Sequence, residues 1–492
     1  MFFSTKKMDG RYNNASILQI ALFSLNTAAT TMFLALMEYT SYFVNGVLGF
    51  AVMLTSVILT GLRIFDGVID PFIGFIVDRT DGRFGKFRPF MVLGNVMMAS
   101  SSIILFYASS SAPKVLRLVI FILAYVVFVI GYTFQMIVAK SGQTVMTNNP
   151  KLRPLATYFD SLFITSCFGG TSLYVSAYLI PKYGGYTNKA LYHEFALFVI
   201  SISAICTVLA VIGIWNKDRK EFYEESEGRK VTIKDYMDVL AHNKPIRMLV
   251  TAASINKFAQ MVYGNITVGV MLFGIMMQNY KLYGQIGLVT AIPNLLVVTI
   301  GVAVAQRVGQ KKAFTIFTWM AVGFQIVMTG VLLFGNLTEI GLTKFNGISL
   351  LFFAVYILLN GSKSVSNNIV VPMIADCSDY EVFRSGMYVP GLMGALFSFV
   401  DQVISALGTA FVGAAVALIG FRNILPQVED NLTEEIRLVT IICYCIVPIA
   451  AWLISLFAMR YYELDKEAMA EISEYRQKKH SHRKTLHSRK SY

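Results

Sequence analysis

The sequence has few charged residues. Asp, Glu, Lys and Arg make up 14% of its 492 residues, whereas a soluble domain usually contains about 25%. Hydrophobic residues account for 55% of the chain, and the mean hydropathy is positive. This composition argues against a soluble protein and favours one that spends much of its length in a lipid bilayer.

Cysteine is also scarce. The five cysteines lie in or beside apolar runs, without a C-x-x-C pair and without histidines at metal-ligand spacing: Cys167, Cys206, Cys377, Cys443 and Cys445. A disulfide framework or a metal site would need such a pattern. We interpret these cysteines as small residues that pack helices.

Other signatures are missing. No G-x-x-x-x-G-K-S/T loop is present, which argues against ATP-driven transport by this chain. No nucleophile, base and orienting group stand at a usable spacing, so an enzyme is not expected. Residues 1–14 are polar, and no cleavage site follows a short apolar core, so we expect the first apolar run to stay in the mature protein.

The sequence is rich in long apolar runs. A hydrocarbon core of about 30 Å needs about 20 helical residues for each crossing. Runs of this kind recur along the whole chain. We predict membrane-spanning helices over 16–43, 47–77, 88–110, 115–141, 154–181, 194–215, 247–276, 283–305, 312–335, 347–374, 387–420 and 435–459.

The stretch between the sixth and seventh runs is charge-dense. Its apolar residues Val231, Tyr236, Val239 and Leu240 suit a short amphipathic helix at the cytoplasmic surface. We therefore predict an all-α membrane protein of twelve transmembrane helices in two six-helix halves. Its parts are an N-terminal six-helix bundle (1–215), a cytoplasmic linker with the amphipathic helix (216–246), a C-terminal six-helix bundle (247–460) and a basic cytoplasmic tail (461–492).

The net charge of +13 belongs to the loops and the tail. Its distribution fits the positive-inside rule if both termini are cytoplasmic, and it lacks the folded basic surface typical of nucleic-acid binding. We expect a multi-pass protein of the cell membrane that contacts lipid and binds no nucleic acid. The tail can also contact anionic headgroups.

The loops after the second and eighth runs are alike. The first contains Gly74, Asp78, Arg79, Arg83 and Lys86, and the second contains Gly301, Gln306, Arg307, Gly309, Lys311 and Lys312. Their matching places resemble the loop signature of the major facilitator superfamily. That resemblance implies two repeated halves that rock about a site near the midplane of the membrane.

Charged residues inside the predicted spans are functional candidates, because each costs at least about 2.5 kcal/mol to insert. Arg63, Asp66 and Asp70 are three and four residues apart, so they lie on one stripe of a helix. Repulsion and lost hydration disfavour two ionised carboxylates, and a bound H⁺ or Na⁺ resolves that conflict. Pro71 also leaves the Gly67 carbonyl without its helical donor. The alternative is an Arg63–Asp66 salt bridge with Asp70 capping a helix break.

Further charged or polar candidates lie on other spans. They are Glu38, Lys140, Asp160, Lys257, Lys363 and Asp401, of which Lys140, Asp160 and Lys257 can lie nearer a helix end. Thr133, Met136 and Lys140 share one helical face. Asn360, Lys363, Ser364 and Asn367 form a polar stripe that suits either a polyhydroxylated or anionic ligand or helix packing.

Three motifs resemble the glycoside-pentoside-hexuronide:cation symporters, the family of the melibiose permease. They are the stretch from Arg63 to Pro89, the segment Ala375-Asp376-Cys377-Ser378-Asp379-Tyr380, and Phe397-Ser398-Phe399-Val400. The resemblance assigns cation binding to Asp66 and Asp70, with Thr133 assisting and Arg63 as the charge partner. Sodium-using members tend to have a neutral polar residue where this chain has Ile69, which favours H⁺ over Na⁺.

The same resemblance locates the substrate residues. The acidic residues that bind sugar in the melibiose permease type correspond to Asn26 and Met136, a tryptophan corresponds to Lys140, and a lysine to Gln402 beside Asp401. A neutral galactoside is therefore not the expected substrate. Lys140 and Lys363 could receive a carboxylate, as in a hexuronide. The candidate substrate-binding residues are Asn26, Lys140, Lys363, Asn367, Gln402 and Asp401.

The leading hypothesis is secondary active symport of H⁺ or Na⁺ with a glycoside or sugar-like solute, without any other cofactor or metal. Two alternatives remain. The first is a cation-coupled transporter of an amphipathic lipid or a conjugated steroid. The second is a membrane sensor with the same fold that does not transport.

Overall fold

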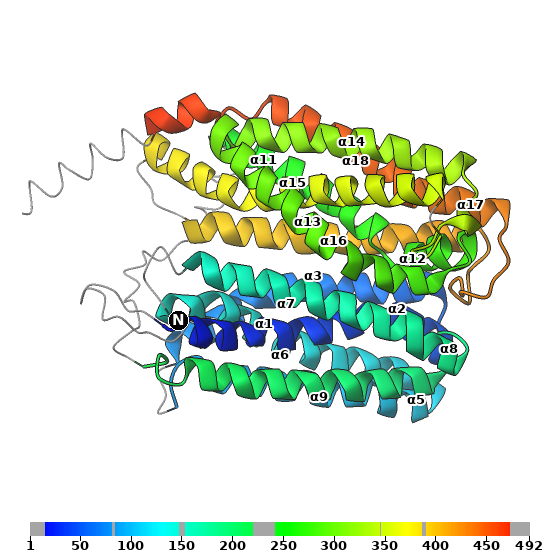
Figure 1. Cartoon of the computed structure of the whole chain (residues 1–492). Coiled ribbons are helices and arrows are strands. Elements are labelled where there is room, and N and C mark those ends of the chain that lie inside the picture. Colours follow the sequence, from blue (N-terminus) through cyan, green and yellow to red (C-terminus); the bar gives the residue numbers. More distant parts are fainter. Residues whose placement is uncertain are drawn as a thin grey trace, which may run out of the picture. The chain divides into compact units, whose positions relative to one another are not determined.

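The computed structural model describes residues 15–80, 84–146, 153–219, 242–344, 346–385 and 390–472, and its regular structure there is helical (Figure 1). The long helices are α1 (Ile17–Met37), α3 (Val52–Arg79), α4 (Arg88–Ile103), α6 (Lys114–Met146), α7 (Arg153–Tyr174), α9 (Lys189–Ile214), α11 (Lys244–Tyr263), α13 (Tyr280–Val308), α14 (Gln310–Phe334), α15 (Gly347–Ser385), α16 (Pro390–Leu418) and α18 (Val447–Arg460).

The short helices mostly extend these spans. They are α2 (Thr40–Tyr42), α5 (Ser109–Ser111), α8 (Ile180–Tyr183), α12 (Ile266–Gly269) and α17 (Glu434–Ile441), and a single 3-10 turn follows α14 at Leu337–Glu339. Single π-helical segments lie at Phe43–Val47, Ile104–Ala108, Val175–Leu179, Val270–Met276 and Ile442–Ile446.

The helices confirm an all-α membrane protein. Within the described ranges, 11 helices are long and apolar enough to cross a membrane, or up to 12 if the bent pair Lys244–Tyr263 and Ile266–Met276 is one span. The bend in that pair is 48° and follows Gly264. The N-terminus of the first span is capped, because Ser16 and Gln19 form a reciprocal capping box.

The chain divides into two compact units. Unit 1 contains the described residues of 1–227, 269–289 and 413–436, and unit 2 contains those of 228–268, 290–412 and 437–472. Unit 1 thus includes two short segments from the second half of the sequence. The two predicted six-helix halves, with their boundary at 216–246, stay a prediction.

In unit 1, α1 packs against α7 and α9, and α6 packs against α3 and α4. Helices α4 and α6 cross at close range at Gly94 and Gly131. A Cβ atom on Gly94 would lie 2.7 Å from the Gly131 carbonyl oxygen, and the converse distance is 2.8 Å. The two helices can approach this closely because neither residue has a side chain. This crossing fixes the part of α6 that carries Thr133.

Polar contacts hold the segment 413–436 to the first half of the chain within unit 1. Asn45 Nδ2 donates to the Asn423 carbonyl at 2.6 Å, and Asn45 Oδ1 accepts the Leu425 N–H at 2.6 Å. The Tyr42 hydroxyl donates to the Pro426 carbonyl at 2.8 Å. Both side chains are almost completely buried, so these bonds satisfy backbone groups that would otherwise lack partners.

In unit 2, α14 packs against α15 and α11 packs against α18. Buried apolar side chains from these helices form one cluster, which includes Leu249, Phe314, Ile369, Met373 and Met459. Unlike the lipid-facing surface, this cluster is almost free of solvent contact. It holds together the helices that carry Tyr263 and Lys363.

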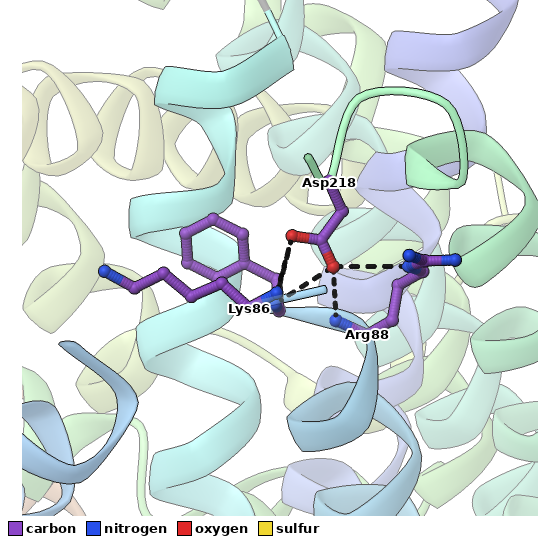
Figure 2. Close-up of polar contacts among 4 residues, drawn as sticks. Lys86, Arg88 and Asp218 are labelled. Atoms are coloured by element: carbon purple, nitrogen blue, oxygen red, sulfur yellow. Dashed lines mark hydrogen bonds and ion pairs between the residues drawn. The ribbon is translucent and has the colours of Figure 1, made fainter. Parts of the chain in front are cut away.

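A carboxylate joins the end of α9 to the start of α4 (Figure 2). Asp218 is fully buried and accepts the backbone N–H groups of Lys86, Phe87 and Arg88 at 3.0 to 3.2 Å. Arg88 Nε also lies 3.3 Å from Asp218 Oδ2, and its guanidinium lies over the Trp215 ring. An anion is favoured here because the N–H groups and the dipole of α4 converge on it.

Gly85 makes room for this carboxylate. It has a φ of +91°, and a Cβ atom on it would lie 2.2 Å from Asp218 Oδ2. A side chain at this position is therefore disfavoured both by the backbone conformation and by the contact.

Several predicted features fall outside the described residues. They are Arg83, the amphipathic helix with Val231, Tyr236, Val239 and Leu240, and the tail from residue 473 onward.

We expect Asp218→Asn to destabilise the folded protein by about 1 to 3 kcal/mol, because it removes the charge that several N–H groups share. Gly85→Ala should be at least as harmful. Unfolding in mixed micelles measures both. Asp465→Asn is the matched control, because Asp465 also accepts backbone N–H groups but at a more exposed place. Equal stability of the Asp218 and Asp465 variants would contradict this role for Asp218.

Candidate functional site

The predicted cation ligands meet between α3 and α6 in unit 1. Thr133 Oγ1 lies 3.0 Å from Asp70 Oδ1 and 3.4 Å from Asp66 Oδ1. Asp66 is 8% exposed and Thr133 is 1% exposed, whereas Asp70 is half-buried. The structure therefore brings together the three residues to which the sequence assigned one site.

The stripe forms because α3 is continuous. It runs unbroken from Val52 to Arg79, through Asp70 and Pro71. Asp70 therefore does not cap a helix break, which removes that part of the alternative interpretation. Arg63 lies one turn before Asp66 and acts on it electrostatically, and Asp66 and Asp70 repel each other.

The Thr133 hydroxyl suits a position between two carboxyl groups. A hydroxyl can donate one hydrogen bond and accept others. With one aspartate protonated, that aspartate can donate to Thr133 Oγ1 while the Thr133 hydroxyl donates to the other carboxylate. The three groups can thus hold one proton in a connected arrangement. Without the Thr133 hydroxyl, the two carboxyl groups would lack these hydrogen bonds in an environment with little water.

Lys140 lies two turns further along α6 than Thr133. It is exposed and ends the apolar part of α6, although the helix itself continues to Met146. Its ammonium group acts electrostatically on Asp70. Lys140 therefore acts on the aspartate pair, in addition to its predicted role in substrate binding.

Asn26 on α1 is fully buried. Its Nδ2 donates to the Gln135 carbonyl at 3.1 Å, and Thr30 Oγ1 donates to Gln135 Oε1 at 2.8 Å. Gln135 Nε2 in turn donates to the Met91 carbonyl at 2.8 Å. Sequence reasoning did not single out Gln135, although a glutamine in an apolar span is itself a signal. This network ties α1, α4 and α6 together beside Thr133.

Lys363 on α15 is buried in unit 2. It is 7% exposed, and its Nζ lies 3.9 Å from the centre of the Tyr263 ring. Within the part of unit 2 that the structure describes, its recorded partners include no carboxylate. The aromatic ring therefore supplies the main favourable field for this cation.

A small cavity of about 10 Å³ adjoins Lys363. Its lining residues are Asn256, Tyr263, Thr318, Ala321, Lys363, Ser366, Asn367 and Trp452. Asn256 Oδ1 is buried and has no hydrogen-bond donor among the described residues. Lys363 and Asn367 thus share one cavity, whereas Asn360 donates to the carbonyl of Tyr356 on its own helix.

Asp401 on α16 has a partner. Lys257 Nζ on α11 lies 3.3 Å from Asp401 Oδ2, and both side chains are partly exposed. Gln402 is half-buried next to it. The predicted substrate residues therefore form two sets. Asn26 and Lys140 belong to unit 1, and Lys363, Asn367, Asp401 and Gln402 belong to unit 2.

Twelve predicted spans, the helical architecture and an acidic pair inside a membrane helix define a polytopic transporter. Solved structures support the fold. The nucleoside transporter NupG matches with a TM-score of 0.60 at 12% identity, over 91% of this chain and all of that one.

The chain belongs to the family described as MFS/sugar transport protein, whose model matches residues 23–466. It is 23% identical to the putative glycoside/cation symporter YagG of Escherichia coli, over 91% of this chain and 92% of that protein. It is also 23% identical to the isoprimeverose transporter of Lactiplantibacillus pentosus, over 93% and 90%. The family confirms the prediction of a transporter rather than an enzyme.

The contact between Lys363 and Tyr263 can be tested by a double-mutant cycle. We expect Tyr263→Leu to destabilise the protein more than Tyr263→Phe, because phenylalanine keeps the ring face. Combined with Lys363→Met, Tyr263→Leu should show a coupling energy of about 1 to 2 kcal/mol. Unfolding in mixed micelles measures each variant. Additive effects, or equal effects of the Leu and Phe variants, would contradict a cation-π contact.

Proposed function

We propose that the chain is a secondary active transporter that moves H⁺ together with a glycoside or sugar-like solute. The observation that carries this proposal is the group formed by Asp66, Asp70 and Thr133. Two carboxyl groups joined by one hydroxyl, inside a membrane helix, are suited to bind and release a cation. The family match favours a sugar-like solute over a lipid, a steroid or a sensor that does not transport.

Two features favour H⁺ over Na⁺. Na⁺ sites in transporters commonly recruit carbonyl oxygens from unwound helices, but α3 and α6 are both continuous here. Ile69 packs against the apolar cluster that contains Ile73 and Phe134, so it offers no oxygen. Among the described residues, the side-chain oxygens recorded at this site belong to Asp66, Asp70 and Thr133. The expected backbone ligand is the Gly67 carbonyl, which Pro71 leaves without its helical donor.

Coupling follows from linkage between the two ligands. If the solute binds best to the protonated protein, then the proton also binds best to the protein with solute bound. Arg63 and Lys140 act on the aspartate pair, so a change in their position would alter proton affinity. We propose that solute binding and proton binding favour the same conformations, which lets an inward proton gradient drive uptake.

Two observations indicate the class of solute: the names of the relatives and the side chains around Lys363. The relatives are named for glycosides and for isoprimeverose. Lys363, with Asn367 and Asn256 in one cavity, offers a buried cation and amide groups that suit a carboxylate or several hydroxyls. We therefore propose a glycoside that carries an anionic group, such as a hexuronide, as the first class to test.

We further propose that the protein lies in the plasma membrane with both termini cytoplasmic. The concentration of Lys and Arg in alternate loops supports this orientation. Exposed apolar side chains on α9 and α13, among them Ile205, Val208, Ile292 and Ile300, suit contact with lipid.

Removing either carboxylate should abolish accumulation. A gradient of one pH unit supplies about 1.4 kcal/mol, which supports up to about tenfold accumulation if one proton enters with each solute. In membrane vesicles, the wild type should approach this value, and Asp66→Asn or Asp70→Asn should only equilibrate the solute. Asp465→Asn, after the last span, serves as a carboxylate control in unit 2 and should still accumulate the solute. Normal accumulation by both site variants would disprove the assignment.

Thr133→Val should strengthen proton binding, because it removes the hydroxyl that donates to the Asp66 and Asp70 carboxylates and stabilises their ionised form, while keeping the side-chain volume. We expect the proton concentration for half-maximal uptake to fall about tenfold or more, the effect of one hydrogen bond to a charged group. Thr133→Ser should stay near the wild type. The pH dependence of uptake measures this shift, and a Val variant with the wild-type profile would exclude Thr133 from the site.

A further inference from the structure

Asp160 is a further carboxylate within the membrane-spanning part of unit 1, and the site described above does not use it. It lies on α7, is half-exposed, and accepts a hydrogen bond from Gln143 Nε2 of α6 at 2.8 Å. The Ser24 and Thr27 hydroxyls of α1 also act on it, and the Ser24 hydroxyl donates to the Ala156 carbonyl of α7 at 3.5 Å. Three helices that are distant in sequence therefore converge on one acidic group.

The recorded partners of Asp160 among the described residues are neutral. They are two hydroxyls and one amide. Asp66 and Asp70 differ, because Arg63 and Lys140 act on them. A membrane carboxylate without a cationic partner is costly to keep. Neutral hydrogen-bond donors reduce that cost only in part, which makes Asp160 a candidate for function.

Asp160 meets α1 at the level of Asn26. Ser24 and Thr27 lie on either side of Asn26 along the helix, within about 3 Å of rise. Asn26 itself is buried against Gln135, whereas Asp160 and Thr27 are partly exposed. Ser24 is buried as well, so the accessible polar group at this level is the set of Thr27, Gln143 and Asp160.

This set matches the hydroxyl groups of a sugar. A carboxylate can accept hydrogen bonds from two adjacent hydroxyls at once, and such bonds are stronger than those between neutral groups. The Gln143 amide and the Thr27 hydroxyl can both donate and accept. A coupling cation fits less well, because the set contains one carboxylate and lacks the second that the site at Asp66 and Asp70 provides.

We propose that Asp160, with Gln143 and Thr27, is a hydroxyl-binding subsite for the pyranose ring of the transported glycoside. This inference rests on the proposed function and adds a specificity-determining residue to it. It also sets a limit on the substrate. An anionic group would be repelled at Asp160, so the ring must present hydroxyls there and carry any carboxylate elsewhere.

Uptake kinetics in vesicles with an imposed proton gradient test the subsite. The probes are isoprimeverose, lactose and 4-nitrophenyl β-D-glucuronide, and those that the wild type accumulates are carried forward. We expect Asp160→Asn to raise the KM by about 10- to 100-fold, the range for hydrogen bonds to a charged group. The pH dependence of uptake should stay unchanged. Thr165→Val, at an exposed place on the same helix, should behave as the wild type.

Monodeoxy analogues of the accumulated probe separate contact from an indirect effect. Removing a hydroxyl that binds Asp160 should weaken transport in the wild type by at least about tenfold and should have little further effect in Asp160→Asn. Gln143→Leu provides a second variant if Asp160→Asn does not insert, and it should also raise the KM.

An unchanged KM in the Asp160 and Gln143 variants would overturn the subsite alone. A shifted pH dependence at unchanged KM would also overturn it, because Asp160 would then be a second coupling carboxylate. If the wild type accumulates none of the glycosides, the proposed function fails and the subsite fails with it.

Discussion

Two carboxyl groups on successive turns of one membrane helix are the constraint on which the account depends. Asp66 and Asp70 share a face of α3, and the surrounding helices exclude much of the water that would otherwise hydrate them. At this depth two ionised carboxylates repel each other strongly. A proton bound to one of the two aspartates removes one charge, while the Thr133 hydroxyl can donate to the other. The most stable state of the site therefore depends on the cation concentration, which is the basis of coupling.

The packing of unit 1 holds the cation-binding residues of α3 and α6 in fixed relative positions. The crossing at Gly94 and Gly131 brings α4 against α6, and the Gln135 network ties the same stretch of α6 to α1 and α4. Thr133 is therefore anchored on a helix that is fixed from two sides. Asp160 reaches the same group of helices at the level of Asn26, so cation and hydroxyl-binding groups share one packed unit.

The sequence was sufficient for some of these features. Apolar length alone located the spans, and the spacing of Arg63, Asp66 and Asp70 placed them on one stripe, because periodicity determines which residues share a face. Periodicity does not say which helix that face meets. The pairing of Asp401 with Lys257, the ring of Tyr263 against Lys363 and the partners of Asp160 all depend on contacts between distant helices. Thr133 is the one threonine of its predicted span, and the family resemblance assigned it to the cation site.

The central claim is that solute entry carries a proton, and the most direct measurement is proton flow driven by the solute itself. Purified protein is placed in proteoliposomes that contain a pH-sensitive dye, with no ion gradient, and an accumulated glycoside is added outside. The account predicts that the lumen acidifies in proportion to solute entry, and that Asp70→Asn transports solute without acidification. Solute entry into wild-type proteoliposomes without acidification of the lumen would contradict it.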